Sequence, residues 1–189
     1  METCAFFLRA TGLAATAARL SWRGPRATLI VAAAWAAAPW LTSDLVSNVS
    51  GARLFAWVSS PDFVGGLSAF VIAEAFAGGW EAVRRSGSST DGVEERRERL
   101  KRWVARIVAL APSPSLAAGI VGVQTSLFNR ASGWSFGTLD VGLSAAVFLA
   151  IVASASGWRF ARPEPTQRAA EALPLFAALF ALGAMLAPL

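Results

Sequence analysis

Residues 68–80 read SAFVIAEAFAGGW, a run of small and apolar residues that contains one acid, Glu74. A helix of this composition is suited to a lipid bilayer, because nearly all of its side chains present apolar surface to hydrocarbon. A carboxylate in that setting is costly unless it is paired with another group or faces a hydrated cavity. The stretch therefore raises two questions, the medium in which the chain folds and the role of Glu74.

The composition of the whole chain favours a bilayer as that medium. Of the 189 residues, 55% are hydrophobic and only 15% are charged, whereas about 25% of the residues of a soluble domain are charged. The apolar residues form blocks of about 20, the length that crosses the hydrocarbon core. We expect five spans, at residues 27–46, 63–80, 103–123, 139–157 and 170–189.

The spans must be helical, because lipid offers no hydrogen-bond partners to the backbone. We therefore predict an all-α fold, a polytopic integral membrane protein built as a bundle of five transmembrane helices. Residues 27–189 form one transmembrane domain, in which residues 81–102 are a charged cytoplasmic loop. Residues 1–26 carry Arg9, Arg19 and Arg23 on one side of a helical wheel, which predicts an interfacial amphipathic segment on the cytoplasmic side.

The basic residues predict the orientation. Fourteen of the seventeen lie in the N-terminal segment, in loop 81–102 and in the loop after the fourth span. Only Arg53 and Arg130 lie in the other loops, and Arg106 lies just inside the third span. By the positive-inside rule the N-terminus is cytoplasmic and the C-terminus is outside. The Ala- and Arg-rich composition favours a bacterial source, and hence the cytoplasmic (inner) membrane.

The expected partners follow from the same charges. Juxtamembrane arginines attract anionic lipid headgroups, so we expect the bilayer itself to be the partner of the basic loops. Nucleic acid is not expected, because eight of the twelve acids share the basic side and no soluble module is present to bind it.

Small residues recur at intervals of four in two of the spans and predict helix-packing seams. They are Gly65, Ala69, Ala73 and Ala77 in the second span, and Gly142, Ala146, Ala150 and Ser154 in the fourth. Helices in a membrane associate through close backbone approach, which small residues permit. The seams predict a tight bundle, a homo-oligomer, or contacts with other membrane subunits.

The third span contains the sequence ALAPSPSLAAG, residues 109–119. Pro112 and Pro114 fall near the expected bilayer midplane, and each removes a backbone donor, so the helix must bend or break there. The freed carbonyls and the hydroxyls of Ser113 and Ser115 predict a local polar site. Transporters build ion or substrate sites from such broken helices, and neighbouring helices can equally satisfy a simple kink.

Two arrangements compete to explain Glu74. Glu74 and Arg106 both lie within ~10 Å of the expected cytoplasmic boundary on consecutive spans, so the two side chains can form a structural ion pair. In the alternative, Glu74 faces a cavity beside the Pro112/Pro114 break and exchanges a proton or meets a cation. Direct contact with a cation favours the structural arrangement, and a cavity favours transport.

Three further acids, Asp44, Asp62 and Asp140, lie near the outer ends of spans. With Asn48 and Gln124 they can ring an external vestibule that attracts cations, as acidic rings do in channels. The simpler interpretation is that they mark helix ends in water.

The chain lacks the residues of most enzyme chemistry. It has no histidine, no tyrosine and one cysteine, so His-assisted nucleophiles, ordinary His or Cys metal sites and haem ligation by His are excluded. We expect no cofactor, no metal and no catalytic activity. The predicted function is that of a structural or assembly subunit of a membrane complex or homo-oligomer. The alternative is a small ion, proton or solute transporter that uses Glu74 and the helix break.

Overall fold

The structure, a computed structural model, describes residues 2–49, 53, 56, 60–86, 113–131 and 133–186, and most of these residues are helical. The helices are α1 (Glu2–Ser21), α2 (Pro25–Ala36), α3 (Ala38–Asn48), α5 (Pro61–Ser86), α7 (Pro114–Arg130), α8 (Phe136–Ala161) and α9 (Pro165–Leu186). The described residues contain no strand, and they confirm the predicted all-α fold class.

Proline and serine set the starts of several helices. The helices that begin on proline are α2, α5, α7 and α9. Proline suits this position because its fixed φ is helical and its missing N–H would have no intrahelical partner. Ser113 and Ser135 cap α7 and α8, where their hydroxyls accept from the backbone N–H groups of Leu116 and Thr138.

Four helical stretches are long and apolar enough to cross a membrane, by length and composition. They are Pro25–Asn48, which joins α2 to α3 through Ala37, and Pro61–Ser86, Phe136–Ala161 and Pro165–Met185. They coincide with the predicted spans 27–46, 63–80, 139–157 and 170–189. The described residues therefore support a membrane protein with four candidate spans, one fewer than the sequence predicts.

The remaining predicted span, residues 103–123, is described only from Ser113 onward. α7 starts there, because Pro114 is its first residue and Ser113, whose backbone is extended, is its N-cap. The resulting helix has 17 residues, short of the ~20 that cross the hydrocarbon core. Residues 103–112, with Arg106 and Pro112, lie outside the described residues.

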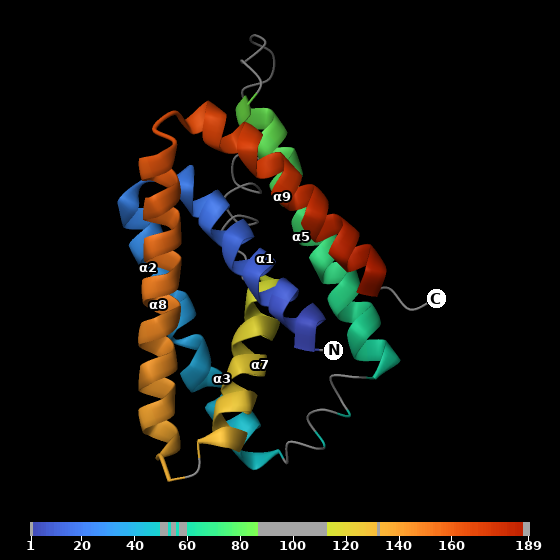
Figure 1. The fold of residues 1–189 in the computed structure, drawn as a ribbon, viewed down its shortest axis with the longest axis vertical. Helices are drawn as coiled ribbons and strands as arrows, with labels where there is room; N and C mark the ends of the chain where they lie inside the picture. Colours follow the sequence, from blue (N-terminus) through green and yellow to red (C-terminus); the bar gives the residue numbers. More distant parts are fainter. Residues whose placement is uncertain are drawn as a thin grey trace, which may run out of the picture.

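α1 lies inside the bundle, where it contacts α7, α8 and α9 (Figure 1). Its second half is enclosed on all sides, and Ala15 and Ala18 are completely buried. The interfacial segment expected at residues 1–26 does not describe this half of the helix. Small side chains explain the difference, because the run AATAA, residues 14–18, lets neighbouring helices approach closely.

The core consists of two clusters that share α1. Ala15, Ala18 and Trp22 pack with residues of α5 and α9, including Val71 and Phe176. Ala17 and Leu20 pack on the other side with residues of α2, α7 and α8, including Trp35, Ile120 and Ile151. α1 thus joins two halves of the bundle that have little other contact with each other (Figure 1).

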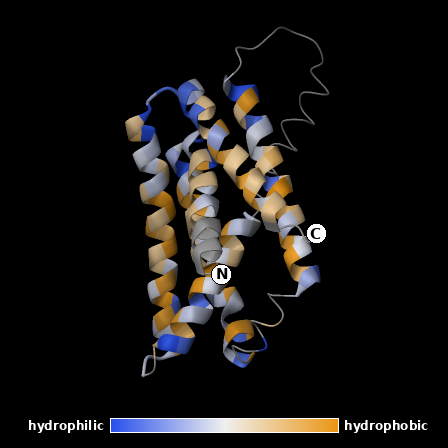
Figure 2. Ribbon diagram, turned by 45° about the vertical axis from the view of Figure 1, so that its right-hand side comes forward, coloured by the Kyte–Doolittle hydropathy of each residue, from blue (hydrophilic) through white to orange (hydrophobic). Residues whose placement is uncertain are grey.

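α5 and α9 form the closest helix pair of the bundle, side by side in both views (Figures 1 and 2). Glycines allow this approach: a Cβ on Gly78 would lie 2.2 Å from the Phe176 ring, and one on Gly183 would lie 2.8 Å from the Ile72 side chain. The Ser68 hydroxyl donates to the Gly183 carbonyl oxygen at 2.7 Å. Figure 2 shows hydrophilic residues gathered at the ends of the bundle and hydrophobic ones along the helices between them.

The contact at Gly78 has a matched control one residue away. Gly78→Ala should lower the thermal unfolding midpoint, because the new methyl overlaps the ring of Phe176, which is only 2% exposed and cannot move aside. Gly79→Ala places its methyl 3.7 Å from the Cβ of Phe176, so it should leave the midpoint unchanged or raise it, since alanine favours helix by ~1 kcal/mol. Equal midpoints for the two variants would contradict the packing.

Candidate functional site

Glu74 lies on the buried face of α5, where α1 and α7 meet it. The residue is 6% exposed. Its carboxylate contacts Arg19 of α1 and Ser115 of α7, so three helices supply the site. The other buried residues of this face, among them Val71, Ala75 and Gly78, pack the same helix against α1 and α9.

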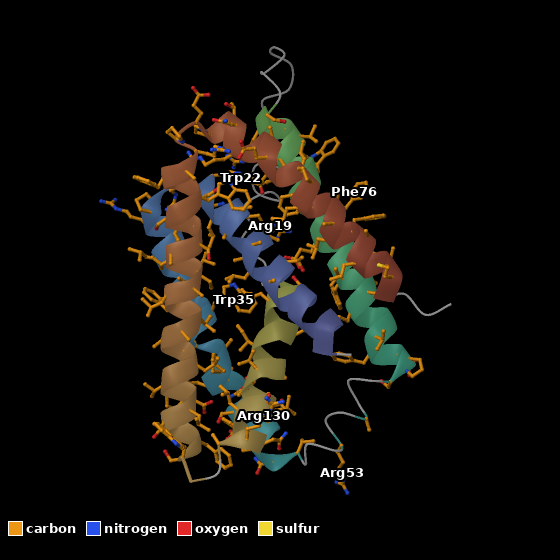
Figure 3. All side chains as sticks on the ribbon, viewed as in Figure 1. Arg19, Trp22, Trp35, Arg53, Phe76 and Arg130 are labelled. Atoms are coloured by element: carbon orange, nitrogen blue, oxygen red, sulfur yellow. The ribbon has the colours of Figure 1, made fainter. Side chains whose placement is uncertain are left out.

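Arg19 is the cation that compensates Glu74. Its Nη1 lies 3.6 Å from Glu74 Oε1, and its Nη2 donates to the Glu74 backbone carbonyl at 2.6 Å. The side chains are 8% and 2% exposed, and the guanidinium sits 5.6 Å from the centroid of the Phe176 ring. Arg19 therefore holds both the side chain and the backbone of Glu74. Figure 3 shows the position of Arg19 on α1. A guanidinium suits this position because it has several donors in a rigid plane and stacks on aromatic faces.

The start of α7 supplies the second set of contacts. The Ser115 hydroxyl donates to Glu74 Oε2 at 2.9 Å, and Ser113 and Ser115 share a hydrogen bond of 2.9 Å. The N-terminus of a helix carries a partial positive charge, and the start of α7 brings that charge beside the carboxylate. α1 approaches this helix end at Gly12, where a Cβ would lie 2.8 Å from the Ser115 hydroxyl and from the Leu116 amide nitrogen.

One oxygen of Glu74 has no hydrogen bond among the described residues. Oε1 is buried, and its nearest described cation is Arg19 at 3.6 Å. Arg19 and Glu74 are thus held together by the attraction of their charges and by the hydrogen bond to the Glu74 backbone carbonyl. Arg19 does not make two parallel hydrogen bonds to the carboxylate oxygens. Removing one member of a buried pair leaves an uncompensated charge, at a cost of about 3–5 kcal/mol.

Three of the six predicted site residues come together here, namely Glu74, Ser113 and Ser115. Pro114 is the first residue of α7 between the two serines. Arg106 and Pro112 lie outside the described residues, so the predicted pair with Arg106 stays a prediction.

Arg19 was missed, because the sequence assigned it to an interfacial segment. The available signal was that a lone arginine follows the run of small residues at 14–18 and needs an acid if that run is buried.

A second buried polar cluster joins α3, α7 and α8. The side-chain amide of Gln124 donates to Asp140 Oδ1 and to the Pro39 carbonyl, both at 2.7 Å. Ser43 donates to Asp140 Oδ2 at 2.6 Å, and Thr42 donates to Gln124 Oε1 at 2.6 Å. The expectation that Asp140 marks a helix end in water is wrong, because Asp140 is 1% exposed and Gln124 is 0% exposed. The sequence grouped Asp140 with Gln124 only in the alternative of an external vestibule, and the structure brings the two together in the interior.

A third cluster closes the end of α1. Arg159 of α8 donates to the carbonyl oxygens of Leu20 and Arg23 at 2.6 and 2.8 Å, and Arg168 of α9 donates to that of Ser21. The last carbonyls of a helix lack intrahelical partners and carry partial negative charge, so the two guanidinium groups satisfy both needs. The α1–α2 and α8–α9 junctions therefore lie at the same end of the bundle.

The predicted packing seams lie mostly outside the core. On α8, Gly142 and Ala146 are exposed, and Ala150 and Ser154 are half-buried. On α5, Ala69 and Ala73 are exposed, and Gly65 and Ala77 are half-buried. Within the chain, α5 uses a different face, which includes Ser68, Val71, Ala75 and Gly78. The residues of both seams are thus largely free to meet lipid or another chain.

Comparison with known proteins gave no match to any family model, curated protein or solved structure.

The ion pair between Arg19 and Glu74 can be tested by a double-mutant cycle in detergent micelles. Glu74→Gln keeps the shape and an acceptor for Ser115 but leaves Arg19 unpaired, so it should lower the free energy of unfolding by about 3 kcal/mol. Adding Arg19→Met in the same chain should restore most of the loss, because no buried charge then remains.

Glu171→Gln serves as the control, because it breaks an exposed ion pair with Arg162. The side chain of Arg162 is 45% exposed and that of Glu171 is 39% exposed. It should cost at most about 1 kcal/mol. Additive losses for Glu74→Gln and Arg19→Met, with no recovery in the double variant, would contradict the pairing.

Proposed function

We propose that the protein is a non-enzymatic multi-pass membrane protein that acts as a structural or assembly subunit, and that it assembles with copies of itself through the α8 seam. The carrying observation is the outward position of that seam. A Cβ on Gly142 would have no atom within 4 Å, and α8 has the smallest buried share of the four candidate spans, 17%. Small residues on an outer face of a membrane helix permit close approach of a second helix.

The polar interior supports a structural role for Glu74. The carboxylate meets a cation on α1 and a hydroxyl on α7, so its charge is compensated by the chain itself. Direct contact of this kind fixes the register of three helices, and it is the arrangement expected for a structural pair. The cation that contacts Glu74 among the described residues is Arg19.

The distribution of charge supports the proposed orientation. Arg159 and Arg168 meet the end of α1, and Arg85 lies over Trp22, so these basic residues share one end of the bundle. Arg53 and Arg130 lie toward the opposite end (Figure 3). By the positive-inside rule we propose that the first end lies in the cytoplasm, with the C-terminus outside and a bacterial inner membrane as the location. The expected cytoplasmic N-terminus does not fit this arrangement, because α1 runs from that end into the bundle over 20 residues (Figure 1).

Transport of a proton or cation is the second candidate, and one observation favours it. Glu74 Oε1 is buried without a hydrogen bond among the described residues, beside the two serines at the start of a broken helix. Broken helices that end at an ionisable group are typical of transporter sites. In this alternative Arg19 and Ser115 hold the carboxylate ready to exchange its proton or meet an ion.

Self-assembly can be tested by disulfide crosslinking in native membranes, in a Cys4→Ser background. Ala146→Cys should give a crosslinked species of twice the 19.8 kDa chain mass, because the α8 seams of two copies face each other. Ala181→Cys, an exposed position on α9 outside both seams, should give none. A heavier adduct with a different protein would support assembly with another subunit, and no product from Ala146→Cys, or equal product from both variants, would contradict the α8 interface.

Transport is separated from assembly by reconstitution into liposomes. If the protein is structural, neither the wild type nor Glu74→Gln conducts protons or alkali cations in a dye-based flux assay. If Glu74 carries transport, the wild type shows flux and Glu74→Gln abolishes it. Glu171→Gln is the matched control, because it removes an acid of the same type that is paired at the surface.

A further inference from the structure

An apolar groove runs between α5 and α9 on the outer face of the bundle. Small residues form part of its lining, namely Ala75 and Gly79 of α5 and Ala177 of α9, and the larger lining residues include Phe76, Trp80 and Phe180. Its volume is about 450 Å³, within the range of about 300–1,000 Å³ that small-molecule sites occupy.

Three exposed side chains follow one another along the α5 side of the groove. Phe76 is 70% exposed and Trp80 is 69% exposed, and Arg84 is exposed one further turn along. Residues four apart on a helix share a face and rise by ~6 Å. Phe76 and Trp80 line the groove, and Arg84 lies beyond its lining on the same helix face. Phe76 points away from the bundle (Figure 3).

Arg84 has no partner among the described residues. Its neighbour Arg85 donates to Glu81 at 2.9 Å and lies over Trp22. On α9, Arg168 is occupied by the Ser21 carbonyl, and the acid Glu171 is paired with Arg162. A positive charge therefore remains available beside Trp80.

We propose that the α5–α9 groove binds an anionic phospholipid, with one acyl chain against Phe76 and Phe180, the ester region at Trp80 and the phosphate at Arg84. Tryptophan favours the interface between chain and headgroup, and arginine binds phosphate through several donors. This assignment adds a specific site to the general expectation that basic loops attract anionic headgroups. It does not depend on the α8 interface.

The shape of the groove favours a lipid over a second helix. Membrane helices associate where small residues let the backbones approach closely. Here Phe76, Trp80 and Phe180 are 70%, 69% and 44% exposed, so they stand between the groove and any helix that would approach it. A flexible acyl chain fits between such side chains, because it needs no flat surface.

The site can be tested on the purified chain by thermal unfolding with added phosphatidylglycerol or phosphatidylcholine of the same acyl chains. Phosphatidylglycerol should raise the unfolding midpoint of the wild type more than phosphatidylcholine does. Arg84→Gln should weaken the apparent affinity for phosphatidylglycerol about fivefold, which corresponds to about 1 kcal/mol for one basic residue at a lipid surface. Glycerol phosphate without acyl chains should leave the midpoint unchanged.

Two further variants control the result. Arg26→Gln removes another exposed arginine, at the start of α2, and should keep the preference for phosphatidylglycerol. Ala177→Phe fills the groove from an exposed position, and should abolish the preference. The proposal is overturned if Arg84→Gln keeps the full preference, if Arg26→Gln loses it equally, or if Ala177→Phe leaves it intact. It is also overturned if Ala177→Phe dissociates a dimer that forms without lipid, because a second copy would then occupy the groove.

Discussion

The buried contact between Arg19 and Glu74 is the constraint that most of the bundle must accommodate. A charged side chain in the middle of an apolar bundle is costly unless an opposite charge lies beside it. Arg19 can be buried on α1 because Glu74 stands on α5, and Glu74 can be buried because Arg19 and the start of α7 meet it. The pair therefore specifies which faces of α1 and α5 point inward, and it places the α7 N-terminus at the same level.

The other contacts of α1 follow from its internal position. Its last carbonyls would be buried without partners, and Arg159 and Arg168 supply the donors. Its alanines contribute to both core clusters, and Gly12 permits the close approach to Ser115 and Leu116. α3 is held without α1, by Gln124 of α7 and Asp140 of α8. The outer faces of α5, α8 and α9 remain available for lipid or other chains.

Sequence patterns predicted the elements well and the contacts between them less well. Hydrophobic blocks located four candidate spans, and Pro114 located the start of α7, because composition and missing donors act locally. The expectation of an interfacial segment does not hold for the second half of α1. Arg9, Arg19 and Arg23 make the segment look superficial, although Arg19 is neutralised by an acid 55 residues away. The seams at Ala69 and Gly142 fit close packing by spacing alone, and spacing does not show whether the partner is within the chain or outside it. Asp140 and Gln124 meet across two helices, which no local pattern encodes.

The central claim is that α1 is an internal helix, and thiol accessibility measures this most directly. Single cysteines at positions 15, 16, 17 and 18, in a Cys4→Ser background, sample every side of α1, since four consecutive residues complete a turn. In intact membranes all four should resist both water-soluble and lipid-soluble maleimides until the protein is denatured, because residues 15–18 are at most 6% exposed. Gly24→Cys, exposed between α1 and α2, should react at once. Rapid labelling of any of the four positions would show that α1 lies on a surface, and would contradict the account.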